Sequence, residues 1–293
     1  MEIILAKSAG FCFGVQRAVD SVYSEIEQSG AKIYTYGPII HNEQVVSDLT
    51  SKGVGVLEDI GQLKNIAEGT VIIRSHGVEK NIYDVLEQKN CSIVDATCPF
   101  VKKIHKIVSE ESSKGKNIII IGNNKHPEVE GIKGWVNGSV QVVNEIEDVE
   151  KLDIPKDSKV CIVSQTTFNH NKFKYLVEII EKKGYDINVV NTICNATHER
   201  QAEAKDISSK VDAMIVIGGR HSSNTQKLYD ICKKECSNTF FVQTAKDLSE
   251  GSDFKNYIKS CESNSLKSIG ITAGASTPKN IIEEVVLNVR DEF

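Results

Sequence analysis

The sequence is poor in proline and has no long apolar run, and each shortage excludes a class of protein. Five prolines and 20 glycines in 293 residues, without a short period, exclude a collagen-like chain. No uncharged apolar run approaches the roughly 20 residues of a membrane helix. The N-terminus has an acidic residue, Glu2, and only a short apolar run, which is not the pattern of a signal peptide. We therefore expect a soluble, cytoplasmic protein with no membrane partner.

An excess of positive charge is also missing. The 35 Lys and Arg residues are outnumbered by 40 Asp and Glu residues, which leaves a net charge of −5. Since phosphate backbones bind basic surfaces, nucleic acid is not an expected partner. Hydrophobic residues make up 40% of the chain, enough for a sizeable core. The length fits about two domains, or three small ones.

Cysteine is too scarce for a disulfide scaffold, with eight in the whole chain, and no two have the CxxC spacing typical of structural zinc. In a reducing compartment such cysteines are core residues, nucleophiles or metal ligands. Cys91 and Cys161 begin β-type runs and are expected in the core. Cys232 and Cys236 lie in a lysine-rich helical segment, and we interpret their CxxxC spacing as incidental.

Three other cysteines, Cys12, Cys98 and Cys194, begin the units of a threefold repeat. Each follows a β-type run and begins a segment with helical spacing. A second apolar run then ends in a glycine and a polar loop, and a third ends in another polar loop before a further helical pattern. Basic residues stand four to six positions after the cysteines: Arg17, Lys102, Lys103 and Arg200.

Alternating strands and helices predict a parallel sheet in each third. The last helical pattern, 279–290, ends the printed sequence, while the N-terminal strand 2–6 leads into Cys12. The N-terminus is therefore expected to complete the last unit. We predict an α/β protein of three small units with parallel sheets around a pseudo-threefold axis. The predicted units are 14–97, 98–193, and 194–293 completed by 1–13.

Ligands of parallel sheets bind beyond the carboxyl ends of the strands, where this repeat places its cysteines and polar loops. Three converging thiolates would suit zinc or an iron–sulfur cluster. A [4Fe–4S] cluster held by three cysteines leaves one iron free to bind substrate as a Lewis acid. The alternative interpretation is three ordinary α/β segments whose cysteines never meet.

The polar loops supply hydrogen-bond donors for an anion such as a diphosphate, and the helices that follow add free N–H groups. The candidate donors are His41, His76, His126, Ser222, Asn224 and Ser276. Glu128 is a candidate proton donor with Glu130 as its rival, and Thr166 is a candidate proton relay. His105 and His198 are interpreted as helix-surface residues.

Eight motifs then occur in one order: GFCFGVQRA, GPIIHN, RSHGV, DATCPFVKK, HPEVEG, VSQTT, SSN and TAGASTP. Together they resemble the 4-hydroxy-3-methylbut-2-enyl diphosphate reductase family, also called IspH or LytB, from Cys12 to Pro278. The resemblance implies three α/β domains around a central cluster. It also implies the last step of the methylerythritol phosphate route, in which an allylic diphosphate loses its hydroxyl and becomes isopentenyl and dimethylallyl diphosphate.

By the family pattern, Cys12, Cys98 and Cys194 would hold one [4Fe–4S] cluster, and the substrate hydroxyl would bind its open iron. Glu128 would supply protons with the help of Thr166, and His126 would link that proton path to the diphosphate. The implied diphosphate ligands are His41, His76, His126, Ser222, Ser223, Asn224 and Ser276. An external ferredoxin or flavodoxin would deliver two electrons.

Other functions stay open from the sequence. A three-cysteine cluster dehydratase similar to quinolinate synthase would share the architecture, but its substrate carries carboxylates and the reaction needs no external electrons. The HPEVEG and SSN loops favour the reductase. A non-catalytic iron–sulfur sensor would not need three histidines and Glu128 at one pocket. A cysteine hydrolase needs one thiolate paired with a base rather than three equivalent cysteines.

Overall fold

The computed structural model describes residues 2–28, 30–261 and 266–291. In these residues the chain forms three four-stranded sheets, and every strand pair in them is parallel. Parallel neighbours need a crossover connection, so strands and helices alternate along the chain. The predicted α/β class, with one parallel sheet in each third, is confirmed.

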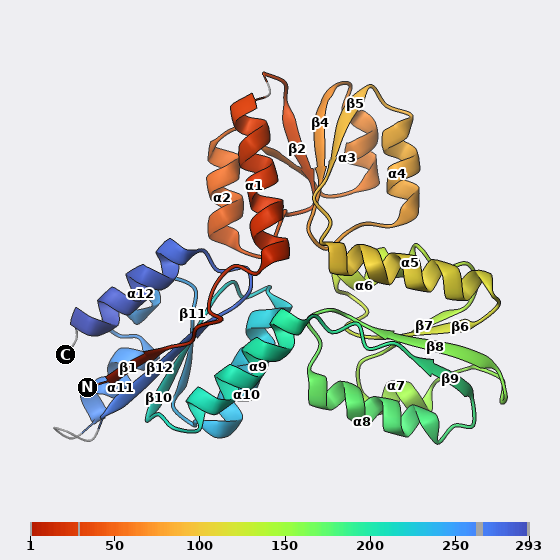
Figure 1. The fold of residues 1–293 in the computed structure, drawn as a ribbon. Coiled ribbons are helices and arrows are strands. Elements are labelled where there is room, and N and C mark those ends of the chain that lie inside the picture. Colours follow the sequence, from red (N-terminus) through yellow and green to blue (C-terminus); the bar gives the residue numbers. More distant parts are fainter. Residues whose placement is uncertain (1, 29, 262–265, 292–293) are drawn as a thin grey trace. The chain divides into compact units, whose positions relative to one another are not determined.

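The first module contains the sheet that follows Cys12. Its strands are β2 (Ile33–Tyr36), β3 (Gly55–Leu57), β4 (Gly69–Ile73) and β5 (Cys91–Asp95), and its helices are α1 (Phe13–Gln28), α2 (Glu43–Ser51), α3 (Ile60–Asn65) and α4 (Lys80–Glu87). The strand order is β3-β2-β4-β5. Figure 1 shows α1 and α2 on one side of this sheet and α3 and α4 on the other. Leu63, Ile82 and Leu86 bury the second pair of helices against the strands.

The second module repeats this order as β7-β6-β8-β9. Its strands are β6 (Asn117–Ile121), β7 (Val140–Val143), β8 (Lys159–Ser164) and β9 (Asp186–Val189), and its helices are α5 (Pro99–Ser113), α6 (Pro127–Lys133), α7 (Ile146–Glu150) and α8 (His170–Glu181). The isoleucines of β6 alternate between two cores. Ile119 and Ile121 pack with α7 and α8, while Ile118 and Ile120 pack with α5 and α6. A strand buried on both faces explains the unbroken apolar run.

The third module has the order β11-β10-β12-β1, so the N-terminal strand completes a sheet formed by the C-terminal third. Its strands are β1 (Glu2–Leu5), β10 (Ala213–Ile217), β11 (Thr239–Val242) and β12 (Ser268–Ala273). Its helices are α9 (Asn195–Ser208), α10 (Ser223–Glu235), α11 (Asp253–Ser260) and α12 (Lys279–Asp291), with a short 3-10 helix, η1 (Ala245–Leu248). Ile3 stands opposite Ile269 in the ladder between β1 and β12. The predicted closure of the repeat by the N-terminus is confirmed.

The described residues divide into two compact units. One unit falls within Met1–Phe13, His41–Val45 and Asn195–Phe293, and the other within Gly14–Ile40 and Val46–Cys194. The predicted boundaries of three domains and the pseudo-threefold axis stay predictions, and residues 1, 29, 262–265, 292 and 293 of those ranges lie outside the described residues. None of the described helices combines the length and the apolar character needed to cross a bilayer.

Ile271 tests the core of the third sheet. It lies fully buried on β12, so Ile271→Ala should lower the free energy of unfolding by about 2–4 kcal/mol, because the lost side chain leaves a cavity. The control is Leu5→Ala on the edge strand β1, where the side chain is 45% exposed and the expected loss is under about 1 kcal/mol. Urea unfolding followed by circular dichroism compares the two. Equal losses would contradict the assigned core.

Candidate active site

The three repeat cysteines occupy the same position in their modules, between the end of a strand and the start of a helix. Cys98 is the N-cap of α5, Cys12 directly precedes α1, and Cys194 directly precedes α9. All three are half-buried, and none forms a disulfide. Helix N-termini favour negative charge, so each position suits a thiolate.

A backbone hydrogen bond fixes each of these cysteines to the loop after the neighbouring strand. The N–H of Cys98 donates to a carbonyl after β4, that of Cys194 to a carbonyl after β8, and that of Cys12 to a carbonyl after β12. The acceptors are Ser75 (3.0 Å), Thr166 (3.0 Å) and Ala275 (3.3 Å), respectively. The same contact thus recurs three times, once at each sheet.

Gly14 makes room for the thiol of Cys98. A Cβ built on Gly14 would lie 2.5 Å from Cys98 Sγ, much closer than such atoms approach. Glycine in the first turn of a helix otherwise weakens the helix. Its presence in α1 is therefore explained by the thiol that packs against it. The GFCFG motif carried this signal, but sequence reasoning assigned Gly14 no role.

The other cysteines have structural surroundings. Cys161, Cys232 and Cys236 lie in hydrophobic cores. Burial raises the pKa of the Cys161 thiol to about 11 and that of Cys232 to about 12. Thiols of this kind stay protonated and inert at neutral pH. Cys91 is half-buried at the start of β5 and packs against the core of the first module.

Glu128 is a buried carboxyl held by one partner residue. It lies in the first turn of α6 and is only 1% exposed. The N–H and hydroxyl of Thr166 donate to its two oxygens, at 2.6 and 2.7 Å. Burial raises the pKa of Glu128 to about 7, although the two bonds from Thr166 act in the opposite direction. Glu130 is exposed, so only Glu128 has the environment of a buried acid.

Thr166 also connects Glu128 to one of the cysteines. Its side chain and N–H bind the carboxyl, while its carbonyl accepts the N–H of Cys194 at 3.0 Å. The carboxyl and the cysteine thus share a single bridging residue. The carboxyl of Glu128 therefore lies at the C-terminal ends of the strands of the second sheet, next to the loop that carries Cys194.

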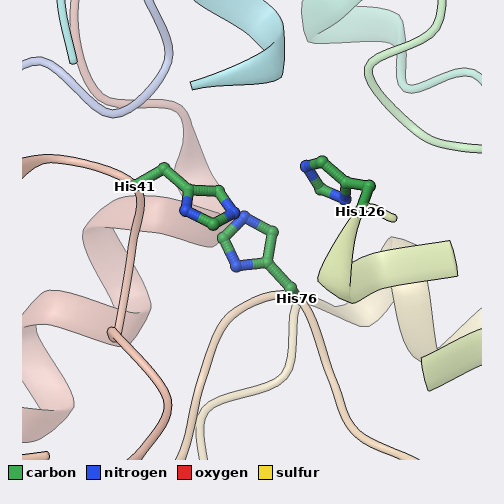
Figure 2. A group of neighbouring side chains, drawn as sticks. All are labelled: His41, His76 and His126. Carbon is green, nitrogen blue, oxygen red and sulfur yellow. The ribbon is translucent and has the colours of Figure 1, made fainter. Parts of the chain in front are cut away.

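His76 and His126 lie edge to face, with ring centroids 5.5 Å apart (Figure 2). His126 is the N-cap of α6, and its Nδ1 accepts the N–H of Glu128 at 3.1 Å. A neutral ring that accepts at Nδ1 carries its proton on Nε2, which leaves that atom as a donor. His41, labelled in the same figure, belongs to the other compact unit.

In that unit, two loops of the third module meet beside His41. Ser276 Oγ donates to the carbonyl of His41 at 3.0 Å and lies 3.3 Å from Ser222 Oγ. Ser222 is the N-cap of α10 and accepts the N–H of Thr225. Asn224, in the first turn, is 4% exposed, and in the described part of the chain its two amide atoms have no hydrogen-bond partner. Since buried amides normally have partners, this arrangement points to a polar ligand.

One sequence expectation is wrong. His105 is not on a helix surface: it is buried and stacks on Trp135, with ring centroids 5.0 Å apart. This burial lowers the pKa of His105 to about 4. Trp135 follows α6, far from His105 in sequence, so helical spacing could not reveal the contact. His198 is exposed, as expected.

Comparison with known proteins gives matches over the whole chain. The LytB protein family model matches residues 3–290. The 4-hydroxy-3-methylbut-2-enyl diphosphate reductase of Thermoanaerobacter sp. (strain X514) is 49% identical over 292 residues, which cover 99% of this chain and 97% of that protein.

Two solved structures agree with this match. An (E)-4-hydroxy-3-methyl-but-2-enyl diphosphate reductase, described as the terminal enzyme of the non-mevalonate pathway, is 39% identical with a TM-score of 0.69, over 99% of this chain and 100% of that one. The E-1-hydroxy-2-methyl-but-2-enyl-4-diphosphate reductase from Plasmodium falciparum is 28% identical with a TM-score of 0.88, over 98% and 87%. The sequence motifs, the three sheets and these matches agree: the chain belongs to the LytB family.

Proposed function

We propose that this chain is a 4-hydroxy-3-methylbut-2-enyl diphosphate reductase. The substrate takes up two electrons and two protons, its C–O bond breaks, and water leaves, which gives isopentenyl or dimethylallyl diphosphate. The observation that carries the proposal is the bridge from Glu128 through Thr166 to Cys194, because it sets a buried acid beside a cysteine of the repeat. The family matches support the substrate.

Cys12, Cys98 and Cys194 would hold a [4Fe–4S] cluster. The residues fit this group: three half-buried cysteines stand at helix N-termini, and Gly14 leaves space beside one of them. When bound, such a cluster supplies electrons and one iron without a cysteine ligand, which acts as a Lewis acid. The wide spacing of the three cysteines does not fit a CxxC zinc site.

Glu128 would be the proton donor. Because its pKa is raised to about 7, a large fraction of the carboxyl is protonated near neutral pH. Thr166 donates hydrogen bonds to both carboxyl oxygens, and its hydroxyl would orient or relay the proton. His126 would connect Glu128 to the diphosphate, since its ring already accepts the N–H of Glu128.

The diphosphate would be bound by donors from several loops. Charged phosphate oxygens accept strong hydrogen bonds from imidazole, hydroxyl and amide groups. The buried amide of Asn224 and the N-terminus of α10 support this role in the third module. The proposed ligands are His41, His76, His126, Ser222, Ser223, Asn224 and Ser276.

The electrons would come from an external ferredoxin or flavodoxin, and we propose a cytoplasmic location. Both follow from the family resemblance. The absence of disulfides among the described cysteines is compatible with a reducing compartment. The matches to named reductases do not favour a quinolinate-synthase-like dehydratase or a sensor.

The role of Glu128 is tested by Glu128→Gln in anaerobically reconstituted protein. The amide is isosteric but cannot give up a proton in the same way, so dye-coupled reduction of the hydroxylated diphosphate should fall by about 100-fold or more. The visible absorbance of the cluster should remain. Glu130→Gln, two positions away and exposed, is the control and should keep wild-type turnover. Full activity of Glu128→Gln would exclude Glu128 from the mechanism.

The raised pKa of Glu128 predicts the pH dependence. The proton is available below the pKa and is lost as pH rises, so kcat/KM should be flat below pH 7 and fall above it. An ordinary carboxyl would produce this fall near pH 4.5. Anaerobic initial rates from pH 5.5 to 9 in one ionic strength give the profile. If the residual activity of Glu128→Gln keeps the same fall near pH 7, another group causes it.

Gly14→Ala tests the space around Cys98. The new Cβ would collide with Cys98 Sγ, so the variant should bind markedly less iron and sulfide after reconstitution. Alanine strengthens a helix relative to glycine by about 1 kcal/mol, so a weaker α1 cannot explain such a loss. Gly30→Ala, where a Cβ meets nothing within 4 Å, is the control. Equal iron content in both variants would disprove the packing argument.

A further inference from the structure

Arg200 donates hydrogen bonds to the backbone of the loop that leads into Cys12. It lies on α9, one turn after Cys194, and is 3% exposed. Its Nε donates to the carbonyl of Ser8 at 2.9 Å, and its Nη2 donates to that of Gly10 at 2.8 Å. Both acceptors lie between β1 and Cys12, so the guanidinium fixes the backbone directly before the cysteine.

Glu203, on the same helix, accepts hydrogen bonds from the backbone N–H groups of that loop. Its carboxylate accepts the N–H of Lys7 at 2.8 Å and the N–H of Ser8 at 2.9 Å. These bonds from Ser8 and Lys7 act against burial, and the pKa of Glu203 is lowered. Because Arg200 binds carbonyls of this loop and Glu203 binds its N–H groups, the backbone of the loop is fixed.

Arg17 makes the corresponding contact in the first module. It lies on α1, one turn after Cys12, and its Nη2 donates to the carbonyl of Thr97 at 2.6 Å and, more weakly, to that of Asp95 at 3.4 Å. Thr97 is the residue directly before Cys98. The helix that begins at one cysteine thus holds the loop that ends at the next cysteine.

The second module holds the loop before its next cysteine in a different way. At the position that corresponds to Arg17 stands Lys103, which is exposed. The loop before Cys194 is held instead by Thr192, whose hydroxyl accepts the N–H of Ser164 at 2.7 Å and donates to its carbonyl at 2.6 Å. The arginine contact is therefore present in two modules. In the remaining module the exposed Lys103 serves as a control position.

We propose that Arg17 and Arg200 are positioning residues that hold Cys98 and Cys12 in the geometry required by an iron–sulfur cluster, an inference that rests on the proposed function. Arg200 uses two nitrogens of its planar fork to bind two carbonyls at once, which an ammonium does not do in the same geometry. Arg17 reaches its two carbonyls through Nη2 alone. Loops fixed before assembly need not be ordered by the cluster, so the bound cluster is retained longer.

The test compares reconstituted wild-type protein with Arg17→Met, Arg200→Met and Lys103→Met under anaerobic conditions. The loss of cluster absorbance after addition of an excess of an iron chelator gives the release rate. Removal of residues that orient metal ligands typically weakens metal binding by about 10–100-fold, so both arginine variants should release iron at least about tenfold faster. Lys103→Met should match the wild type.

A conservative variant and a destabilised control separate positioning from general stability. Arg200→Lys keeps the charge but loses the fork, so its release rate should fall between those of the wild type and Arg200→Met. Ile119→Ala weakens the fully buried core of the second module, whose cluster contains no residue of either loop, and should release iron at the wild-type rate. The electron paramagnetic resonance spectrum of the reduced cluster should change in the arginine variants only.

The outcomes separate the positioning role of the two arginines from the proposed function. Release rates of Arg17→Met and Arg200→Met equal to that of Lys103→Met would overturn the positioning role. Equally fast release from Ile119→Ala would also overturn it, because the arginines would then act only through stability. A wild-type chain that assembles no cluster would instead refute the proposed function on which the inference rests.

Discussion

The hydrogen bond from each repeat cysteine to the loop of the neighbouring strand is the constraint on which the site depends. Parallel strands end at one edge of their sheet, so the loops after two adjacent strands lie side by side. Here one loop carries the cysteine and the other supplies the carbonyl, at Ser75, Thr166 and Ala275. A helix begins at the residue after each cysteine, which leaves the thiol at the helix N-terminus.

The loops that supply these carbonyls also carry the polar chemistry. His76 follows Ser75, Ser276 follows Ala275, and Thr166 itself binds the buried Glu128. One backbone arrangement thus joins a cysteine to a different polar side chain in each module. The three modules share a fold but not a role: the second holds the acid, and the third holds Asn224 and the two serines. Divergence of side chains on a repeated backbone thus gives each module its own polar groups, although the net charge of the chain is −5.

Much of this could be predicted from the sequence because it depends on local pattern. The apolar runs, the cysteine spacing and the unpaired last helix predict the parallel sheets and their completion by β1. The local pattern left Glu128 and Glu130 as rivals and only the family resemblance chose Glu128, because the difference in burial depends on how the short helix α6 packs. The contacts between Gly14 and Cys98, and between His105 and Trp135, join residues far apart in the chain. No spacing rule encodes such pairs, which arise only from the tertiary packing of the chain.

The central claim is that three equivalent cysteines, and no others, supply the protein ligands of one cluster. Its most direct test is the iron and sulfide content of four reconstituted single variants: Cys12→Ser, Cys98→Ser, Cys194→Ser and Cys91→Ser. Each of the first three should lose most of its iron and sulfide while the circular dichroism spectrum stays that of a folded α/β protein. Cys91→Ser, at a half-buried strand end, should retain the wild-type content. A repeat-cysteine variant with full iron content, or a loss equally large in Cys91→Ser, would contradict the account.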